Sequence, residues 1–250
     1  MAPAAEIVRL ELLADEAWPP AVVEEHDGWL LRWAEGPWNR TNSVAPMEAG
    51  RAPLAAKIDH AERWYRERRR PPNFKLTPAS QPEQLEEGLV RRGYEIGFAV
   101  SVQRREAVAG TEPAGLHVEP RPTPAWLEAK RRLSGGGIER ARHLPTLLAR
   151  IRAPAAYASM ESGGRVAAVG LAVITSGHVG VFDLAVDPHA RRRGLATAVV
   201  EGLVSWGART GAATAYLQVE TANAPALHLY DKLGFAEVYR YWYRVLRTAA

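Results

Sequence analysis

The chain has 250 residues, a formal net charge of +4 and no cysteine, which excludes a disulfide framework and a thiol nucleophile. Its length fits one large or two compact domains, and 47% hydrophobic with 24% charged residues is typical of a globular protein. The sequence holds no apolar run of about 18 residues and no basic-then-apolar leader, so we expect a cytoplasmic protein without a membrane partner.

The first part of the chain alternates between strand and helix patterns. Gly36 and Pro37 mark a turn between the first two strands, and Gly93 follows the last helix. The predicted elements are a helix over 6–15, strands over 28–36 and 39–44, a helix over 54–69, a strand over 73–77, a helix over 82–92 and a strand over 95–103. From the first strand onward the order is ββαβαβ.

Residues 106–115 have the composition of a linker. Beyond them we expect a strand over 116–119, helices over 123–133 and 143–152, strands over 166–175 and 179–186, a helix from Gly194, a strand over 213–219, a helix from Ala224 and a strand over 237–246. The later elements repeat the order found before the linker, which indicates two tandem copies of one unit. The expected domains are therefore 1–105 and 116–250.

Residues 179–206 form the central unit of the second copy. A β-branched, apolar strand is followed by a turn that contains Arg191, Arg192 and Arg193, and then by an amphipathic helix. The first turn of a helix presents free N–H groups and the positive end of its dipole. Gly194 would let an anion approach the backbone closely, so this unit predicts an anion site.

Two signatures resemble those of the GNAT superfamily of N-acetyltransferases. Arg191-x-x-Gly194-x-Ala196 is similar to the loop that holds the pyrophosphate of acetyl-coenzyme A, and Asn223 with Tyr230, two helical turns apart, is similar to the second half of the GNAT pattern. The resemblance covers roughly residues 116–245 and implies an α/β fold of mixed sheet and flanking helices. The first copy has neither signature, so we expect it to be a degenerate GNAT-like domain that covers or shapes the substrate cleft.

The resemblance implies direct transfer of an acetyl group from acetyl-coenzyme A to an amine, without a metal. Tyr230 would protonate the departing thiolate, and the strand at residues 184–186 would separate from its neighbour and bind the pantetheine arm. The implied cofactor-binding residues are Leu184, Ala185, Val186, Arg191, Arg192, Arg193, Gly194, Leu195, Ala196, Thr197 and Asn223.

The base that takes the proton of the amine is not determined by the sequence. Gln218 stands where ribosomal-protein alanine acetyltransferases have a glutamate, and an amide cannot act as a base. Asp183 and Glu220 are the remaining acidic candidates, and each could instead be a surface or turn-capping carboxylate.

Several alternatives stay open. The chain could be a non-catalytic acyl-coenzyme A-binding module that engages a protein partner through its first half. No histidine spacing indicates a metal, and no recognition motif favours nucleic acid. The acceptor, a small-molecule or peptide amine, is not identified, because fold and cofactor do not imply substrate. A homodimer is equally open.

Overall fold

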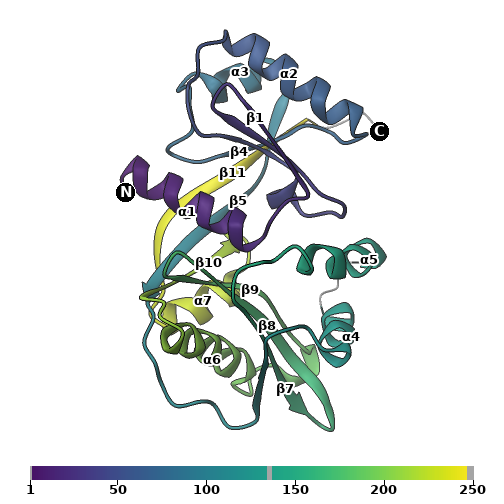
Figure 1. Ribbon diagram of the computed structural model, residues 1–250, viewed down its shortest axis with the longest axis vertical. Coiled ribbons are helices and arrows are strands. Elements are labelled where there is room, and N and C mark those ends of the chain that lie inside the picture. The colour runs from purple at the N-terminus through teal and green to yellow at the C-terminus, as the bar shows by residue number, and fades with distance from the viewer. Residues whose placement is uncertain (1, 134–136, 247–250) are drawn as a thin grey trace.

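The computed structural model describes residues 2–133 and 137–246, and its strands within these ranges form one mixed sheet of 11 strands, in the order β1-β2-β3-β4-β11-β5-β10-β9-β8-β7-β6 (Figure 1). Helices cover the sheet at both ends of the molecule, and the expected α/β architecture of two GNAT-like units is confirmed. The elements of the first unit are α1 (Ala4–Ala17), β1 (Val22–His26), β2 (Trp29–Trp33), β3 (Val44–Pro46), α2 (Leu54–Glu67), β4 (Asn73–Leu76), α3 (Leu85–Arg91) and β5 (Tyr94–Glu106). Those of the second are β6 (Leu116–Glu119), α4 (Pro124–Leu133), α5 (Gly137–Leu148), β7 (Ala155–Ser162), β8 (Arg165–Thr175), β9 (His178–Val186), α6 (Leu195–Arg209), β10 (Thr214–Glu220), α7 (Ala224–Lys232) and β11 (Ala236–Leu246).

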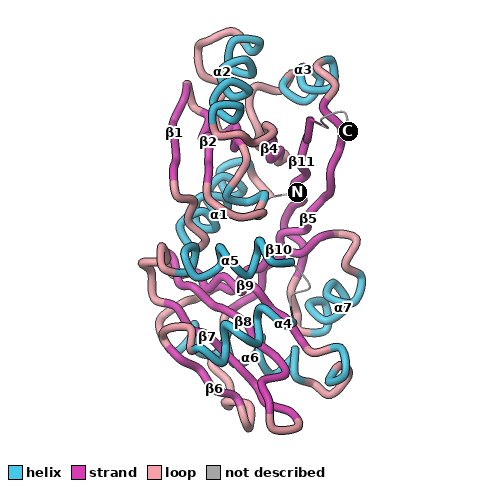
Figure 2. Tube along the Cα trace, turned by 90° about the vertical axis from the view of Figure 1, so that its right-hand side faces the viewer, coloured by secondary structure: helices cyan, strands magenta, loops and turns pink. Residues whose placement is uncertain are grey.

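The two units share their long strands. β5 comes from the first unit but lies between β10 and β11 of the second, and it pairs with β10 from Glu106 to Val100. β11 in turn lies between β5 and β4, where Trp242 to Val245 pair with β4 of the first unit. Figure 2 shows β5 and β11 running together from one unit into the other. Each unit therefore contributes a long strand that pairs with strands of the other, and all of these strands belong to one continuous sheet.

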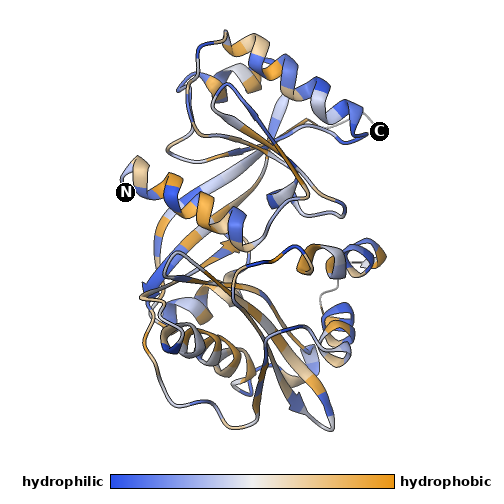
Figure 3. Ribbon diagram, viewed as in Figure 1, coloured by the Kyte–Doolittle hydropathy of each residue, from blue (hydrophilic) through white to orange (hydrophobic). Residues whose placement is uncertain are grey.

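In the second unit, two apolar cores lie on opposite faces of the sheet. α6 and α7 cover one face, where Val199 and Leu203 pack against the sheet beside Gly170. A Cβ on Gly170 would lie 2.7 Å from Val199, so this position needs a glycine for the helix to pack closely. α4 and α5 cover the other face, with Trp126 buried against it. Figure 3 shows apolar residues both in the strands and in the helices that cover them.

Helix α1 lies between the two units (Figure 1) and is buried against both. Its Ala14 and Ala17 belong to the core under α4 and α5, and Ile7 and Leu10 pack on β5 and β11. It also carries a buried acidic residue, Glu11, and a half-buried one, Asp15, that pair with basic residues of the first unit. Glu11 pairs with Lys75 of β4, and Asp15 accepts two 2.6 Å hydrogen bonds from Nη1 of Arg32 on β2. The N-terminal helix thus joins the units by apolar packing against strands of both and by ion pairs with the first.

The predicted strand over 39–44 is wrong. Residues 39–41 form a 3₁₀ turn, and only Val44–Pro46 pair as a strand. The cause is Asn42, whose buried side chain accepts a hydrogen bond from Ala34 N and donates to the carbonyl oxygens of Gly36 and Trp38. These bonds hold the segment as a folded loop instead of a ladder. Strands β1 and β7 are additions that the sequence analysis did not predict, and α5 begins and ends earlier than expected.

None of the helices within residues 2–133 and 137–246 has the length and apolar character that crossing a membrane requires.

Candidate active site

The two central strands of the second unit separate from each other at one end. β9 and β10 pair in parallel from Thr214↔His178 to Leu217↔Val181, and no pairing between them continues beyond that point in the described chain. Each strand keeps its other neighbour, because β9 pairs with β8 as far as Val186 and β10 pairs with β5 as far as Glu220. Residues 182–186 and 218–220 therefore face a gap with unpaired backbone groups, where residues 184–186 were expected to separate.

The turn after β9 leads the chain to the N-terminus of α6. Gly194 caps this helix at φ 79°, a conformation that favours glycine, and a Cβ there would meet nothing within 4 Å. The first hydrogen bond of the helix runs from Ala198 N to Gly194 O. The N–H groups of residues 195–197 therefore have no partner within the helix and are available to an anion. Arg191, Arg192 and Arg193 are exposed around this turn, as an anion site requires.

A buried carboxylate holds this turn in place. Asp187 accepts a hydrogen bond from His189 N through Oδ1, and its Oδ2 accepts 2.9 Å bonds from Arg132 and Arg165. The backbone bond from His189 and the two guanidinium groups hold the pKa of Asp187 below its usual value. Arg132 and Arg165 are distant from Asp187 in the sequence, so no local pattern indicates these contacts.

Asn223 and Tyr230 lie on α7, as predicted from their spacing. The Asn223 side chain accepts a 3.3 Å hydrogen bond from Ala226 N and caps the helix. Tyr230 is buried in the same apolar core as Leu184 and Val186 of the separated strand, on the α6 face of the sheet. Burial raises the pKa of Tyr230 to about 12, and its hydroxyl has no hydrogen-bond partner among residues 2–133 and 137–246.

Both acidic candidates lie toward the opposite face. Asp183 occupies an irregularity of β9 with φ 56°, where Lys130 of α4 donates to its carbonyl oxygen at 2.9 Å and pairs with its Oδ1 at 3.2 Å. Glu220 is exposed at the end of β10, and its side chain has no partner among the described residues. The structure thus separates the tyrosine from the carboxylates by the thickness of the sheet, with the strand gap between them.

Gln218 lies beside the gap on the same face as Glu220, because side chains alternate along a strand. The hydroxyl of Tyr241 on β11 donates a 2.9 Å hydrogen bond to Gln218 Oε1. The Nε2 of Gln218 is buried without a partner in the described chain. Because Tyr241 holds the Oε1 of Gln218, the Nε2 donor of the same amide points away from Tyr241 and lies beside the gap.

The first unit has no free site at the corresponding place. There the Asp27 carboxylate accepts hydrogen bonds from Arg51 N and Ala52 N just before α2, and these bonds lower the pKa of Asp27 to about 2. Lys57 donates to the carbonyl oxygens of Asp27 and Ala49, each at 2.7 Å. The turn's own donors are therefore bound to an internal carboxylate, and no external phosphate is needed to satisfy them.

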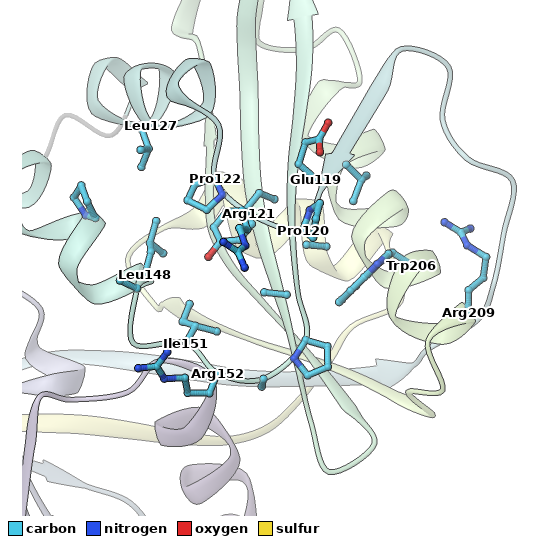
Figure 4. Close-up of a pocket in the computed structure, with 18 of the residues that line it drawn as sticks. Glu119, Pro120, Arg121, Pro122, Leu127, Leu148, Ile151, Arg152, Trp206 and Arg209 are labelled. Carbon is cyan, nitrogen blue, oxygen red and sulfur yellow. The ribbon is translucent and has the colours of Figure 1, made fainter.

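A large cavity lies remote from this site. It has a volume of about 1020 Å³ and lies at the β6 and β7 edge, between the start of β7 and the C-terminal end of α6, where Trp206 and Arg209 line it (Figure 4). Pairing across β8 aligns Ala155 of β7 with Gly180, at the opposite end of β9 from the gap. The cavity therefore does not form part of the candidate active site.

The fold and this strand gap define an acyltransferase of the GNAT type. A family model described as "Probable histone acetyltransferase Rv0428c C-terminal" matches residues 4–244, and the chain belongs to this family.

Two curated relatives are also N-acetyltransferases by name. The chain is 28% identical over 251 residues to the uncharacterized N-acetyltransferase YobR of Bacillus subtilis, covering 97% of this chain and 99% of that protein. Over 78 residues it is 36% identical to the ribosomal protein bS18-alanine N-acetyltransferase of Escherichia coli, covering 31% of this chain and 53% of that enzyme.

Solved structures confirm the fold. A GCN5-related N-acetyltransferase from Kribbella flavida superimposes with a TM-score of 0.73 at 16% identity, covering 100% of this chain and 97% of that one. A tandem GNAT protein from the clavulanic acid biosynthesis pathway gives a TM-score of 0.59 at 15% identity, covering 78% and 70%. The arrangement in two GNAT-like units is therefore shared with known proteins.

Proposed function

We propose that this acyltransferase moves an acetyl group from acetyl-coenzyme A directly to an amine, through the gap between β9 and β10. The observation that supports this most strongly is the end of pairing at Leu217↔Val181 while both strands keep their outer neighbours. Free backbone groups in the gap suit the amide-rich pantetheine arm and can polarise a thioester carbonyl. The N-terminal turn of α6, with Arg191, Arg192, Arg193, Gly194, Leu195, Ala196 and Thr197, would hold the pyrophosphate.

The two faces of the sheet have separate tasks in this proposal. On the α6 face, Tyr230 keeps its proton at neutral pH and gives it to the departing thiolate, and Asn223 fixes the start of its helix. On the opposite face of the sheet, which α4 and α1 cover, the amine approaches from the side on which the first unit lies. A non-catalytic acyl-binding module would have no use for a protonated tyrosine on the leaving-group side, so the alternative is not favoured.

The domain division at residues 106–115 is part of this proposal. Residues 1–105 would shape the acceptor side, and residues 116–250 would carry the chemistry. Helix α1 supports this role because it lies over the acceptor face of the second unit.

A bulky residue at the α6 turn should strongly weaken binding of the cofactor. We expect Gly194→Trp to weaken the affinity for acetyl-coenzyme A by about 100-fold or more, equivalent to about 2.7 kcal/mol, because the indole fills the space ahead of the helix. Isothermal titration calorimetry measures this directly. Gly211→Trp is the matched control, since Gly211 also has a positive φ and open space but lies at the other end of α6. Equal binding by Gly194→Trp and wild type would contradict the site.

We propose Glu220 as the base, because its side chain is free while Asp183 is held by Lys130. Glu220→Gln should lower kcat by about 100-fold, with little change in KM for acetyl-coenzyme A. Asp183→Asn should lower kcat by less, since Lys130 already pairs with that carboxylate. A kcat in Glu220→Gln within twofold of wild type would exclude Glu220 as the base.

A further inference from the structure

A second group of functional side chains lies on the first unit, far from the strand gap. Glu24 and His26 lie on the edge strand β1, and His60 lies on α2 beside them. His60 Nε2 is 2.7 Å from Glu24 Oε1, and the two imidazole rings are stacked with centroids 3.7 Å apart and planes 7° from parallel. One donor atom from each of the three side chains lies within 4.8 Å of the others.

These three side chains offer two imidazole nitrogens and a carboxylate oxygen, a donor set that suits zinc and similar divalent transition metals. Tetrahedral zinc with bonds of about 2.0–2.1 Å needs donor atoms about 3.4 Å apart. The two stacked rings aim their in-plane lone pairs side by side, so each imidazole must turn out of the stack before both nitrogens can converge on one ion, and the contact between His60 and Glu24 must open. His60 would then keep its proton on Nδ1, and water would complete the coordination.

The carboxylate is already held in position for such a role. Trp64 Nε1, one helical turn after His60, donates a 2.6 Å hydrogen bond to Glu24 Oε2, which leaves Oε1 directed at His60. The guanidinium of Arg68 stacks 3.6 Å over the Trp64 ring and fixes the indole. Partners of this kind orient metal ligands and are a regular part of metal sites. All three candidate ligands are half-buried, so an ion could reach them from solvent.

We propose that Glu24, His26 and His60 bind a Zn²⁺ ion that ties the edge strand β1 to helix α2. Among the described strands, β1 is an edge strand that pairs with β2 alone. The ion would secure the exposed edge of the first unit. The site lies on the unit opposite to α6 (Figure 1), so it is independent of the acetyl-transfer site and of the proposed function.

The test is titration of the full chain, free of any histidine tag, with Zn²⁺ alone. We expect one equivalent to bind in the micromolar range or tighter and to raise the melting temperature, since binding to the folded state stabilises it. Replacing Zn²⁺ by Co²⁺ gives a visible absorption band whose intensity reports the coordination number. His26→Ala and His60→Ala should each weaken binding by about 100-fold, and Glu24→Gln by about 10-fold or more.

His117→Ala serves as the matched control, because His117 is an exposed histidine on β6 of the other unit. It should bind Zn²⁺ as the wild type does. Circular dichroism identifies a variant that fails to fold, and Glu24→Gln, which preserves size, then decides the outcome. The proposal is overturned if wild-type protein binds no Zn²⁺ at micromolar concentration, or if Glu24→Gln and both histidine variants bind it as tightly as wild type.

Discussion

Tyr230→Phe should lower kcat by about 100-fold or more while leaving the affinity for acetyl-coenzyme A unchanged. The phenylalanine ring keeps the packing on Phe235 and loses only the hydroxyl that would protonate the leaving thiolate. Stopped-flow or thiol-trapping assays give kcat, and calorimetry gives the affinity. Tyr157→Phe is the matched control, since burial and the Asp183 carboxylate also raise the pKa of Tyr157 to about 12, yet it lies on the other face.

The pH dependence of the same reaction follows from the pKa of Tyr230. Because burial raises that pKa to about 12, the hydroxyl remains protonated across the range in which enzymes are assayed. We therefore expect that deprotonation of Tyr230 does not lower kcat as the pH rises to about 10. A kcat in Tyr230→Phe within twofold of wild type would exclude this residue as the acid.

The second large effect concerns stability. Lys75→Met should lower the free energy of unfolding by about 3–5 kcal/mol, because it leaves Glu11 as a buried carboxylate without its cation. Chemical denaturation measures the change. Adding Glu11→Gln to Lys75→Met removes the charge but keeps an acceptor for the 2.6 Å hydrogen bond from the Tyr239 hydroxyl. The double variant should recover more than half of the loss.

The pH dependence of the free energy of unfolding should have opposite signs in the wild type and in Lys75→Met. In the wild type, burial alone would raise the pKa of Glu11, but the charge and hydrogen bond of Lys75 bring it below the ordinary value. Its contribution to stability is then full above the unfolded pKa of about 4.3 and is lost as the pH falls through the folded value. In Lys75→Met, burial dominates and raises the pKa, so stability should instead fall as the pH rises above about 4.3. The same slope in both proteins would contradict the pairing of Glu11 with Lys75.

The sequence predicted those parts of the molecule that depend on local pattern. The strand over 179–186, the glycine at the start of α6 and the Asn223 cap are each set by residues close in the chain, and the structure has all three. Tyr230 was placed on the correct helix because two helical turns separate it from Asn223. The roles assigned to these residues remain predictions.

Contacts between distant residues explain the rest. Asn42 forms a loop in place of a strand because its side-chain bonds replace a ladder, and no local pattern reveals their partners. The hydrogen bonds that hold Asp187 come from Arg132 and Arg165, which lie on other elements. The sharing of β5 and β11 was not predicted either, because the order of elements along a chain does not specify which strand lies beside which.

The shared sheet determines what supports each side of the gap between β9 and β10. β10 has only four paired residues with β9, from Thr214 to Leu217, but seven with β5, from Thr214 to Glu220. One wall of the gap is thus carried by the second unit's own strands and the other by a strand that residues 94–106 supply. A gene cut at residue 116 would encode all the signature residues and yet lack the support for β10. We therefore expect a substitution that shifts the first unit to change the width of the gap between β9 and β10 in the second.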